Sequence, residues 1–174
     1  LQATEKQLFV AFAAGSGITP IISILKTTLH EAPLSQFILF YGNRGFDQVI
    51  FREELEELKS LFPARLAIHH VFSRESMGND LFQGHINAEK CTAFAKHFFQ
   101  PATVDTYFLC GPEEMVFAVK ETLEASGVEA KQIKFELFTT NTVKKAPRPR
   151  STSPSLEANV TVIQDGVALE FLLP

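Results

Sequence analysis

The stretch LFVAFAAGSGITP, residues 8–20, decides the fold. Its first seven residues are continuously apolar and run into a glycine, the pattern of a strand buried on both faces of a parallel sheet. Thr19 and Pro20 then predict a helix over 20–30, with Thr19 as N-cap and Pro20 at the first helical position. A buried strand followed at once by a helix is the first unit of an α/β fold.

The same alternation of strand and helix patterns continues to about residue 138. It predicts a doubly wound, five-stranded parallel sheet of Rossmann-like type, with helices between the strands. The helix expected over 47–61 has apolar residues at Ile50, Leu55, Leu58 and Leu61, and Asn87 and Gly127 are expected to cap and to stop later helices. The further strands are expected at 37–41, 65–73, 104–110 and 133–138, and the further helices at 87–99 and 112–126.

The composition changes after Thr139, where Lys, Arg, Pro and Ser replace almost all apolar residues. Two alternating strand patterns follow, joined at Asp165-Gly166, a dipeptide that favours a tight hairpin. We therefore expect a main domain over 1–140, a flexible linker over 141–157, and a hairpin over 158–174 that begins a second domain. The polar start at Leu1, without an initiator Met or a signal-peptide pattern, suggests a segment of a longer chain.

Composition narrows the classes of function. A net charge of −4 gives no basic field for nucleic acid, and no apolar run is long enough to cross a bilayer, so we expect a cytoplasmic protein. Cys91 and Cys110 lie in unlike surroundings, which argues against a disulfide. No metal-ligand spacing occurs, and the neighbours His69 and His70 should point to opposite faces of a strand, so no metal site is expected.

The glycines of the opening stretch suggest an anion site. Gly15 and Gly17 let the backbone approach a ligand closely, and the free N–H groups at the start of the helix favour a pyrophosphate. The alternative is a tight strand-to-helix turn that binds nothing, since a Gly-x-Gly by itself is a weak motif.

Four motifs, each at the end of a predicted strand, carry a resemblance to a known family: Gly15-Ser16-Gly17-Ile18-Thr19-Pro20, Tyr41-Gly42-Asn43-Arg44, Ser73-Arg74-Glu75 and Cys110-Gly111-Pro112. Residues 8–138 resemble the nucleotide-binding domain of the ferredoxin–NADP reductase family. Spacing and tail are most similar to the reductase components of phenylacetyl-CoA (ring-hydroxylating) oxygenases, which carry a flavin domain, a nucleotide domain and a plant-type 2Fe–2S ferredoxin domain. The hairpin would then be the first part of a truncated ferredoxin domain.

The resemblance implies a role for each motif in binding the dinucleotide. Ser73 and Arg74 would hold a 2′-phosphate, which favours NADPH because the Arg fork suits a dianion. Glu75 instead favours NADH, because an acidic side chain at this position can accept a hydrogen bond from a free ribose 2′-OH. Arg44 would add a second positive charge, or pair with Asp47 on the surface. The residues expected to form the pyrophosphate loop are Gly15, Ser16, Gly17, Thr19 and Pro20.

A second group of residues matches the hydride-transfer face of the family. Cys110, followed by Gly111 and Pro112, would lie against the nicotinamide ring and align it without covalent chemistry. Glu136 and Phe138 would lie near the junction of nicotinamide and flavin. The alternatives are that Cys110 is a small buried hydrophobe and that Phe138 belongs to the core.

The resemblance implies an electron-transfer function. In the full-length protein, electrons would pass from NADPH through FAD and a 2Fe–2S cluster to an oxygenase component, with the flavin and ferredoxin domains as partners in the same chain. The segment itself carries neither the flavin motif nor the cluster cysteines, so alone it should bind dinucleotide without oxidising it. The alternatives are an NADH-dependent reductase of the same family and a non-catalytic module that senses dinucleotides.

Overall fold

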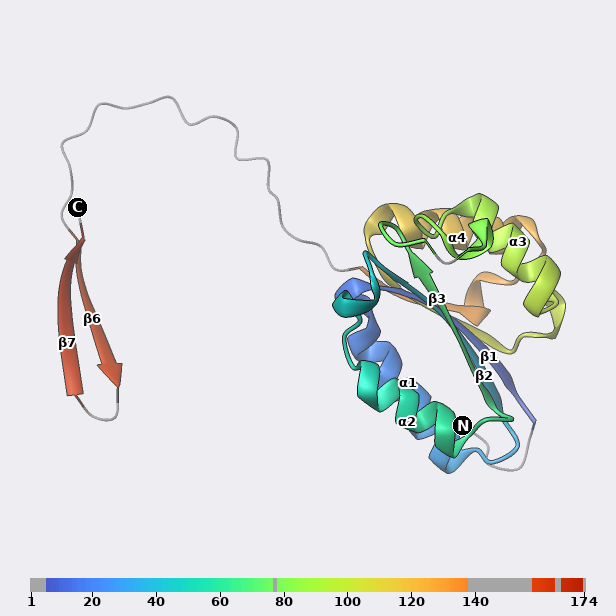
Figure 1. The fold of residues 1–174 in the computed structure, drawn as a ribbon, viewed down its shortest axis with the longest axis horizontal. Coiled ribbons are helices and arrows are strands. Elements are labelled where there is room, and N and C mark those ends of the chain that lie inside the picture. Colours follow the sequence, from blue (N-terminus) through green and yellow to red (C-terminus); the bar gives the residue numbers. More distant parts are fainter. Residues whose placement is uncertain (1–5, 77, 138–157, 165–166, 174) are drawn as a thin grey trace, which may run out of the picture. The chain divides into compact units, whose positions relative to one another are not determined.

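The computed structural model describes residues 6–76 and 78–137 and the two strands at 158–164 and 167–173. The chain divides into two units, 1–139 and 140–174. The first unit is a five-stranded parallel sheet in the order β3-β2-β1-β4-β5, which confirms the predicted fold (Figure 1). Its strands are β1 (Leu8–Ala14), β2 (Gln36–Asn43), β3 (Leu66–Phe72), β4 (Thr106–Gly111) and β5 (Ile133–Leu137).

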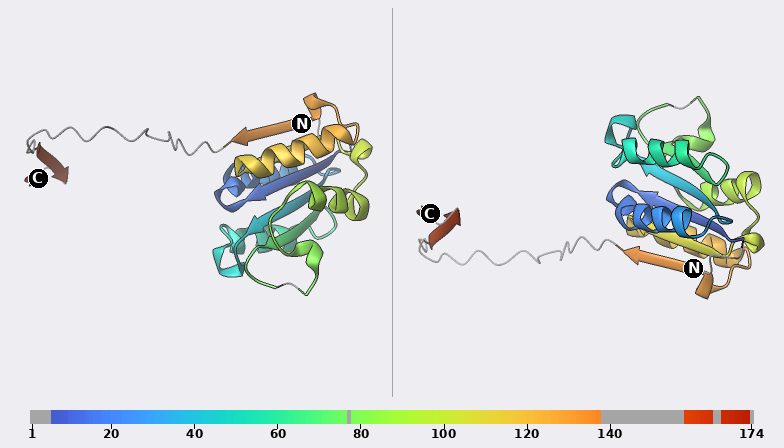
Figure 2. Two further views of the ribbon diagram at one scale, coloured as in Figure 1. Left: turned by 90° about the horizontal axis from the view of Figure 1, so that it is seen from above. Right: turned by 90° about the horizontal axis from the view of Figure 1, so that it is seen from below.

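Helices cover both faces of this sheet, as the alternation of patterns predicts. Helices α1 and α2 lie on one face, and α3 and α4 lie on the other (Figures 1 and 2). Their bounds are α1 (Ile18–Glu31), α2 (Arg52–Leu61), α3 (Ala88–Phe98) and α4 (Glu113–Ala125).

The central strand β1 divides the core in two. Phe9, Ala11 and Ala13 pack under α1 and α2, whereas Val10 and Phe12 pack under α3 and α4. All five are at most 3% exposed. Burial on both faces explains why the strand reads as a continuous apolar run instead of an alternating one.

The start of α1 differs from the prediction. The helix begins at Ile18, with Gly17 as the N-cap, because the Gly15–Gly17 segment is already wound as a 3₁₀ turn. Thr19 is therefore not the cap: its hydroxyl donates to the Ser16 carbonyl oxygen at 2.9 Å. Pro20 still lies in the first turn, where a backbone N–H has no partner within the helix.

The helix predicted over 47–61 is wrong in its first part. A 3₁₀ turn occupies Phe46–Gln48, and α2 begins only at Arg52. The preceding residue, Phe51, has φ 57° and ψ 30°, a left-handed conformation that a right-handed helix cannot pass through. Ile50 consequently lies outside the helix and is 41% exposed, while Leu55 and Leu58 are buried as predicted and Leu61 is exposed.

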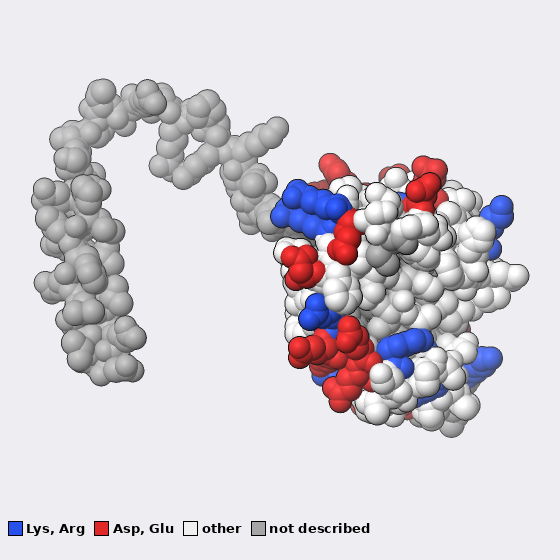
Figure 3. Space-filling model, viewed as in Figure 1, with Lys and Arg blue, Asp and Glu red and all other residues white. Residues whose placement is uncertain are grey.

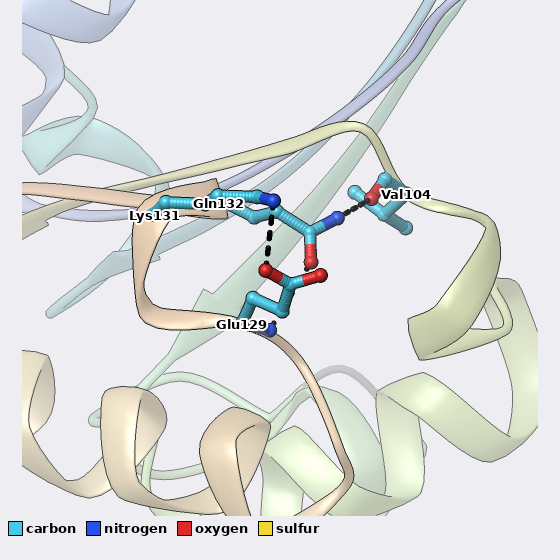
Figure 4. Close-up of polar contacts among 4 residues, drawn as sticks. All are labelled: Val104, Glu129, Lys131 and Gln132. Carbon is cyan, nitrogen blue, oxygen red and sulfur yellow. Dashed lines mark hydrogen bonds and ion pairs between the residues drawn. The ribbon is translucent and has the colours of Figure 1, made fainter.

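The predicted signals at α3 and after α4 are confirmed. The Asn87 side chain accepts a hydrogen bond from the Lys90 amide at 2.9 Å, and Gly127 has φ 88° just after α4 ends. Beyond it, the Gln132 side chain donates to the Val104 carbonyl oxygen at 2.9 Å and forms a capping box with Glu129 (Figure 4). This hydrogen bond links the segments that lead into β4 and β5.

The two histidines of β3 point to opposite faces, as predicted. His69 stacks on Phe40 in the core beneath α3 and α4, and His70 lies against Tyr41 in the other core. Burial lowers the pKa of His69, with Lys59 and His70 contributing, and burial also lowers the pKa of His70 against an opposing effect of Glu56. In the described residues no group of three His, Cys, Asp or Glu could hold a metal ion.

The second unit contains an antiparallel hairpin of β6 (Ala158–Gln164) and β7 (Val167–Leu173). The strands lie where the sequence places them, but the Asp165-Gly166 turn and the linker at 141–157 lie outside the described residues. That this hairpin begins a ferredoxin domain stays a prediction. In the described part of the chain, no helix is long and apolar enough to cross a membrane.

Candidate dinucleotide site

The candidate site residues lie at the carboxyl ends of all five parallel strands. The chain adds β2 and β3 on one side of β1, then returns to place β4 and β5 on the other side. In open parallel sheets, ligands bind at the carboxyl ends of neighbouring strands whose connections run in opposite directions, and here these strands are β1 and β4. The glycine-rich turn after β1 and the Cys110-Gly111-Pro112 segment of β4 meet there.

The glycine-rich turn is held from the side of β2. Gly15 has φ 54°, a conformation that glycine adopts without strain, and a Cβ atom added here would meet nothing within 4 Å apart from its chain neighbours. Its carbonyl oxygen accepts a hydrogen bond from the hydroxyl of Tyr41, a buried residue of β2, at 3.0 Å. The turn therefore has open space on the side where a Gly15 side chain would project, while the bond from Tyr41 fixes its backbone.

The turn is held equally closely from the side of β4. A Cβ atom at Gly17 would lie 2.1 Å from the carbonyl oxygen of Cys110 and 2.9 Å from the amide nitrogen of Gly111. Only glycine allows this approach. Gly17 therefore acts as the contact point between the head of α1 and the end of β4.

The head of α1 presents the predicted pyrophosphate loop to solvent. Ser16 and Thr19 are exposed and Pro20 is half-buried, whereas Gly17 and Ile18 are buried. Helix α1 is 14 residues long, so its first amide groups carry the positive end of a full helix dipole. An anion above Gly15 would meet these amides and no carboxylate from the first turn of the helix.

Arg44 and Arg74 lie together just past the ends of two strands on one side of β1. They line one surface hollow at the ends of β2 and β3, along with Gly45, Asp47, Gln48 and Glu75. The Arg74 amide donates to the Arg44 carbonyl oxygen at 2.9 Å, and the Ser73 amide donates to the Asn43 carbonyl oxygen at 3.0 Å. Among the ion pairs of the described residues, none joins Arg44 to Asp47. On the coloured unit, Figure 3 shows a basic cluster next to acidic side chains at the upper left edge.

Cys110 and Glu136 lie side by side on the other flank of the loop, because β4 and β5 pair in register at these residues. Cys110 is 1% exposed, and burial raises the pKa of its thiol to about 11, with a smaller contribution from Glu136. The thiol is thus neutral at physiological pH, which suits a positioning contact better than nucleophilic attack. Phe138 lies outside the described residues.

Two residues that shape this site are not among the predicted site residues: Tyr41, which the sequence indicates only as part of a motif, and Gly45. Tyrosine at the end of a buried strand is the available signal for the first, since a buried hydroxyl needs a hydrogen-bond partner. Gly45 gives no signal in the sequence, because its role depends on a side chain that follows β3.

Residues 12–121 match the family model described as the oxidoreductase NAD-binding domain. The chain belongs to this family. The matched range contains the glycine-rich turn and the segments that end β2, β3 and β4. The oxidoreductase NAD-binding domain thus accounts for the unit that carries the candidate site.

Relatives of this NAD-binding domain include components of oxygenase systems. One of the subunits of 1,2-phenylacetyl-CoA epoxidase from Escherichia coli is 38% identical over 99% of this chain and 48% of its own length. The ferredoxin reductase component of 3-ketosteroid-9-alpha-monooxygenase from Mycobacterium tuberculosis is 40% identical over 75% of this chain and 33% of its own. The chain spans about half of the first relative and a third of the second.

Solved structures agree on the NAD-binding domain. The cytochrome b5 reductase domain of nitrate reductase from Ulva prolifera aligns with a TM-score of 0.64 and 28% identity, over 76% of this chain and 49% of that one. The ferredoxin–NADP⁺ reductase of Plasmodium falciparum aligns with a TM-score of 0.57 at 22% identity, over 76% of this chain and 52% of that one, which shows the shared fold.

Proposed function

We propose that this chain is the NADPH-binding part of a longer flavin- and iron–sulfur-dependent reductase that delivers electrons to an oxygenase. The supporting observation is the order of the site residues along the sheet. Arg44 and Arg74 follow strands on one side of the glycine-rich turn, while Cys110 and Glu136 lie on strands of the other side. A dinucleotide has the same layout, with its pyrophosphate between the adenosine and the nicotinamide ends.

Each group has a distinct task in this proposal. The amides at the head of α1 bind the pyrophosphate, and Arg44, Ser73 and Arg74 bind the 2′-phosphate. Cys110, with Gly111, Pro112 and Glu136, packs against the nicotinamide and sets its angle, as Phe138 would from beyond β5. A bound flavin supplies the hydride acceptor, which belongs to the part of the reductase outside these strands. The Cys110 thiol, neutral and packed in the core beneath α1 and α2, would contribute to alignment by supporting the ring from the end of β4.

The oxygenase partner rests on the relatives. Both the epoxidase protein of E. coli and the mycobacterial ferredoxin reductase component carry names of oxygenase systems. By this proposal the flavin and ferredoxin domains of the full-length chain are partners too, and the whole protein works in the cytoplasm. A reductase extended to include a flavin domain should reduce ferricyanide with NADPH, while the present chain should not. Flavin-free diaphorase activity from the present chain would contradict the proposal.

An NADH-dependent reductase is a second candidate, and two observations favour it. Glu75 lines the hollow of the two arginines. The relatives also include the NADH nitrate reductase of Ulva prolifera, 33% identical over 67% of this chain.

A titration with half-ligands decides between the two cofactors. 2′-Phospho-AMP should bind more tightly than AMP by about 1.5–3 kcal/mol, the range for hydrogen bonds between charged groups. Arg74→Ala should remove most of that difference. Lys96→Ala is the matched control, because Lys96 is an exposed cation in the last turn of α3, away from the hollow. Equal affinities for the two half-ligands in the unaltered chain would exclude the NADPH assignment.

A further inference from the structure

We propose that Glu75 is a positioning residue for the 2′-phosphate: its carboxylate holds the backbone loop 44–46 against the end of β3, so that Arg44 and Arg74 face one ligand. The inference rests on the NADPH preference proposed above and assigns Glu75 a role within that site. It replaces the interpretation in which this acid accepts a bond from a free ribose 2′-OH.

The carboxylate of Glu75 already has a protein partner. Its Oε2 accepts a hydrogen bond from the Phe46 amide at 2.7 Å, across the gap between the segments that follow β2 and β3. Two backbone bonds run beside it, from Ser73 to Asn43 at 3.0 Å and from Arg74 to Arg44 at 2.9 Å. The bond of Glu75 is the outermost of the three, so it extends the pairing of β2 and β3 past the ends of both strands.

Gly45 leaves room for the Glu75 carboxylate in this bond. A Cβ atom at position 45 would lie 3.0 Å from Glu75 Oε2, at the limit of real contacts. Gly45 has φ −163°, an extended conformation that any residue adopts, so the backbone there does not itself require glycine. The close approach of two carboxylates, Glu75 at 3.0 Å and Asp47 at 3.2 Å from such a Cβ atom, favours glycine between Arg44 and Phe46.

Charge alone would argue against an acid in this hollow. Glu75 and Asp47 line the same surface as the two arginines, and both would repel a phosphate dianion. Glu75 is exposed, so solvent and salt weaken that repulsion. A charge-assisted bond to a backbone amide is stronger than a neutral one and fixes the direction of the loop. By this proposal, the ordering of loop 44–46 by Glu75 favours phosphate binding more than the negative charge of Glu75 disfavours it. Asp47 has a negative charge too, but it does not hold the loop in place.

Two substitutions of Glu75 distinguish the effect of its hydrogen bond to Phe46 from the effect of its negative charge on ligand affinity. Glu75→Ala removes both the carboxylate and the bond to Phe46, so affinity for 2′-phospho-AMP should fall by about fivefold to tenfold. Glu75→Gln keeps a carbonyl oxygen to accept that bond and removes the negative charge, so affinity should equal or exceed that of the unaltered chain. Affinity for AMP should change less than about twofold in both, since AMP lacks the phosphate that the arginines bind.

Two further variants provide controls within the same hollow. Gly45→Ala should shift the flexible Glu75 carboxylate by only a few tenths of an ångström and keep its bond to Phe46, so it should lower affinity for 2′-phospho-AMP less than Glu75→Ala does. Asp47→Ala removes the same charge as Glu75→Ala, but within the described residues the Asp47 carboxylate accepts a bond only from the neighbouring Gln48 side chain, at 3.4 Å. It should therefore leave affinity for 2′-phospho-AMP unchanged or raise it.

The experiment is a calorimetric titration of the full 174-residue chain and its variants with 2′-phospho-AMP and with AMP, alongside amide exchange at Phe46. Exchange at Phe46 should be faster in Glu75→Ala and unchanged in Glu75→Gln. Tighter binding of 2′-phospho-AMP by Glu75→Ala would overturn the inference, as would an equal loss of AMP affinity. Equal affinities for both ligands in the unaltered chain would instead overturn the NADPH assignment, so the two failures are distinguishable.

Discussion

The close approach of Gly17 to the end of β4 can be tested by Gly17→Ala. The added Cβ atom would lie 2.1 Å from the carbonyl oxygen of Cys110, whereas real Cβ contacts are essentially never under 3.0 Å. Because the opposing atoms belong to the backbone, no rotamer change relieves the overlap. The head of α1 and the end of β4 must separate by about 1 Å.

Two effects of opposite sign determine the size of the change. Gly17 has φ −60° and ψ −10°, a helical conformation in which alanine without a clash would stabilise the fold by about 0.4–1 kcal/mol. Overpacking costs about 1–3 kcal/mol, and this site can relax only by moving backbone. Because only backbone can move, the cost should lie near the top of this range, and after the gain is subtracted we expect the free energy of unfolding to fall by about 2 kcal/mol. Affinity for NADPH should fall with it, because the displaced helix head carries the proposed anion site.

Urea unfolding followed by circular dichroism, together with a titration with NADPH, measures both effects. Gly127→Ala is the matched control: Gly127 has φ 88° and an added Cβ atom would meet nothing within 4 Å, so alanine should cost about 1–2 kcal/mol of strain and leave NADPH affinity unchanged. A Gly17→Ala chain that is at least as stable as the unaltered one, and binds NADPH equally well, would refute the close contact between loop and strand.

Four further predictions concern individual contacts. Arg65→Ala should lower the free energy of unfolding by about 1.5–3 kcal/mol in urea, because the guanidinium donates to the Leu29 and Ala32 carbonyl oxygens at 2.6 and 3.1 Å. Gln132→Ala should cost about 1–2 kcal/mol in the same assay, since it removes the bond to Val104. Iodoacetamide should label Cys110 slowly at about pH 7.5 and faster as the pH approaches the thiol pKa of about 11, and NADPH should slow it further; rapid labelling near neutral pH would contradict a buried thiol. Stability should fall as pH drops below about 6.5, because the unfolded chain then binds protons that His69, with its lowered pKa, does not; His69→Phe should reduce that slope.

The sheet could be predicted from the sequence because its signals are local. The apolar run of β1 and the glycine that follows it indicate both the burial and the end of the strand. Asn87 could be predicted as a cap for the same reason, since it bonds an amide only three residues away.

The start of α2 could not be predicted, because it depends on the left-handed conformation of Phe51. A bulky residue rarely adopts positive φ, so the sequence pattern gives no warning of it. The contacts of Tyr41 with Gly15, of Gly45 with Glu75 and of Gly17 with the end of β4 could not be predicted either, because each joins residues that are distant in the chain. Such contacts appear only when the strand order is known.

The strand order also explains why the glycine-rich turn can be both open and fixed. Along the chain the turn comes first among the four motifs, but in space β1 lies in the middle of the sheet, between β2 and β4. Tyr41 of β2 therefore holds Gly15, and the end of β4 meets Gly17, so the turn is fixed by its neighbours and leaves its own outer face free. A ligand that binds above Gly15 then meets amides whose directions are set by two neighbouring strands. Binding needs little further ordering of the loop, which is the condition under which weak backbone contacts give useful affinity.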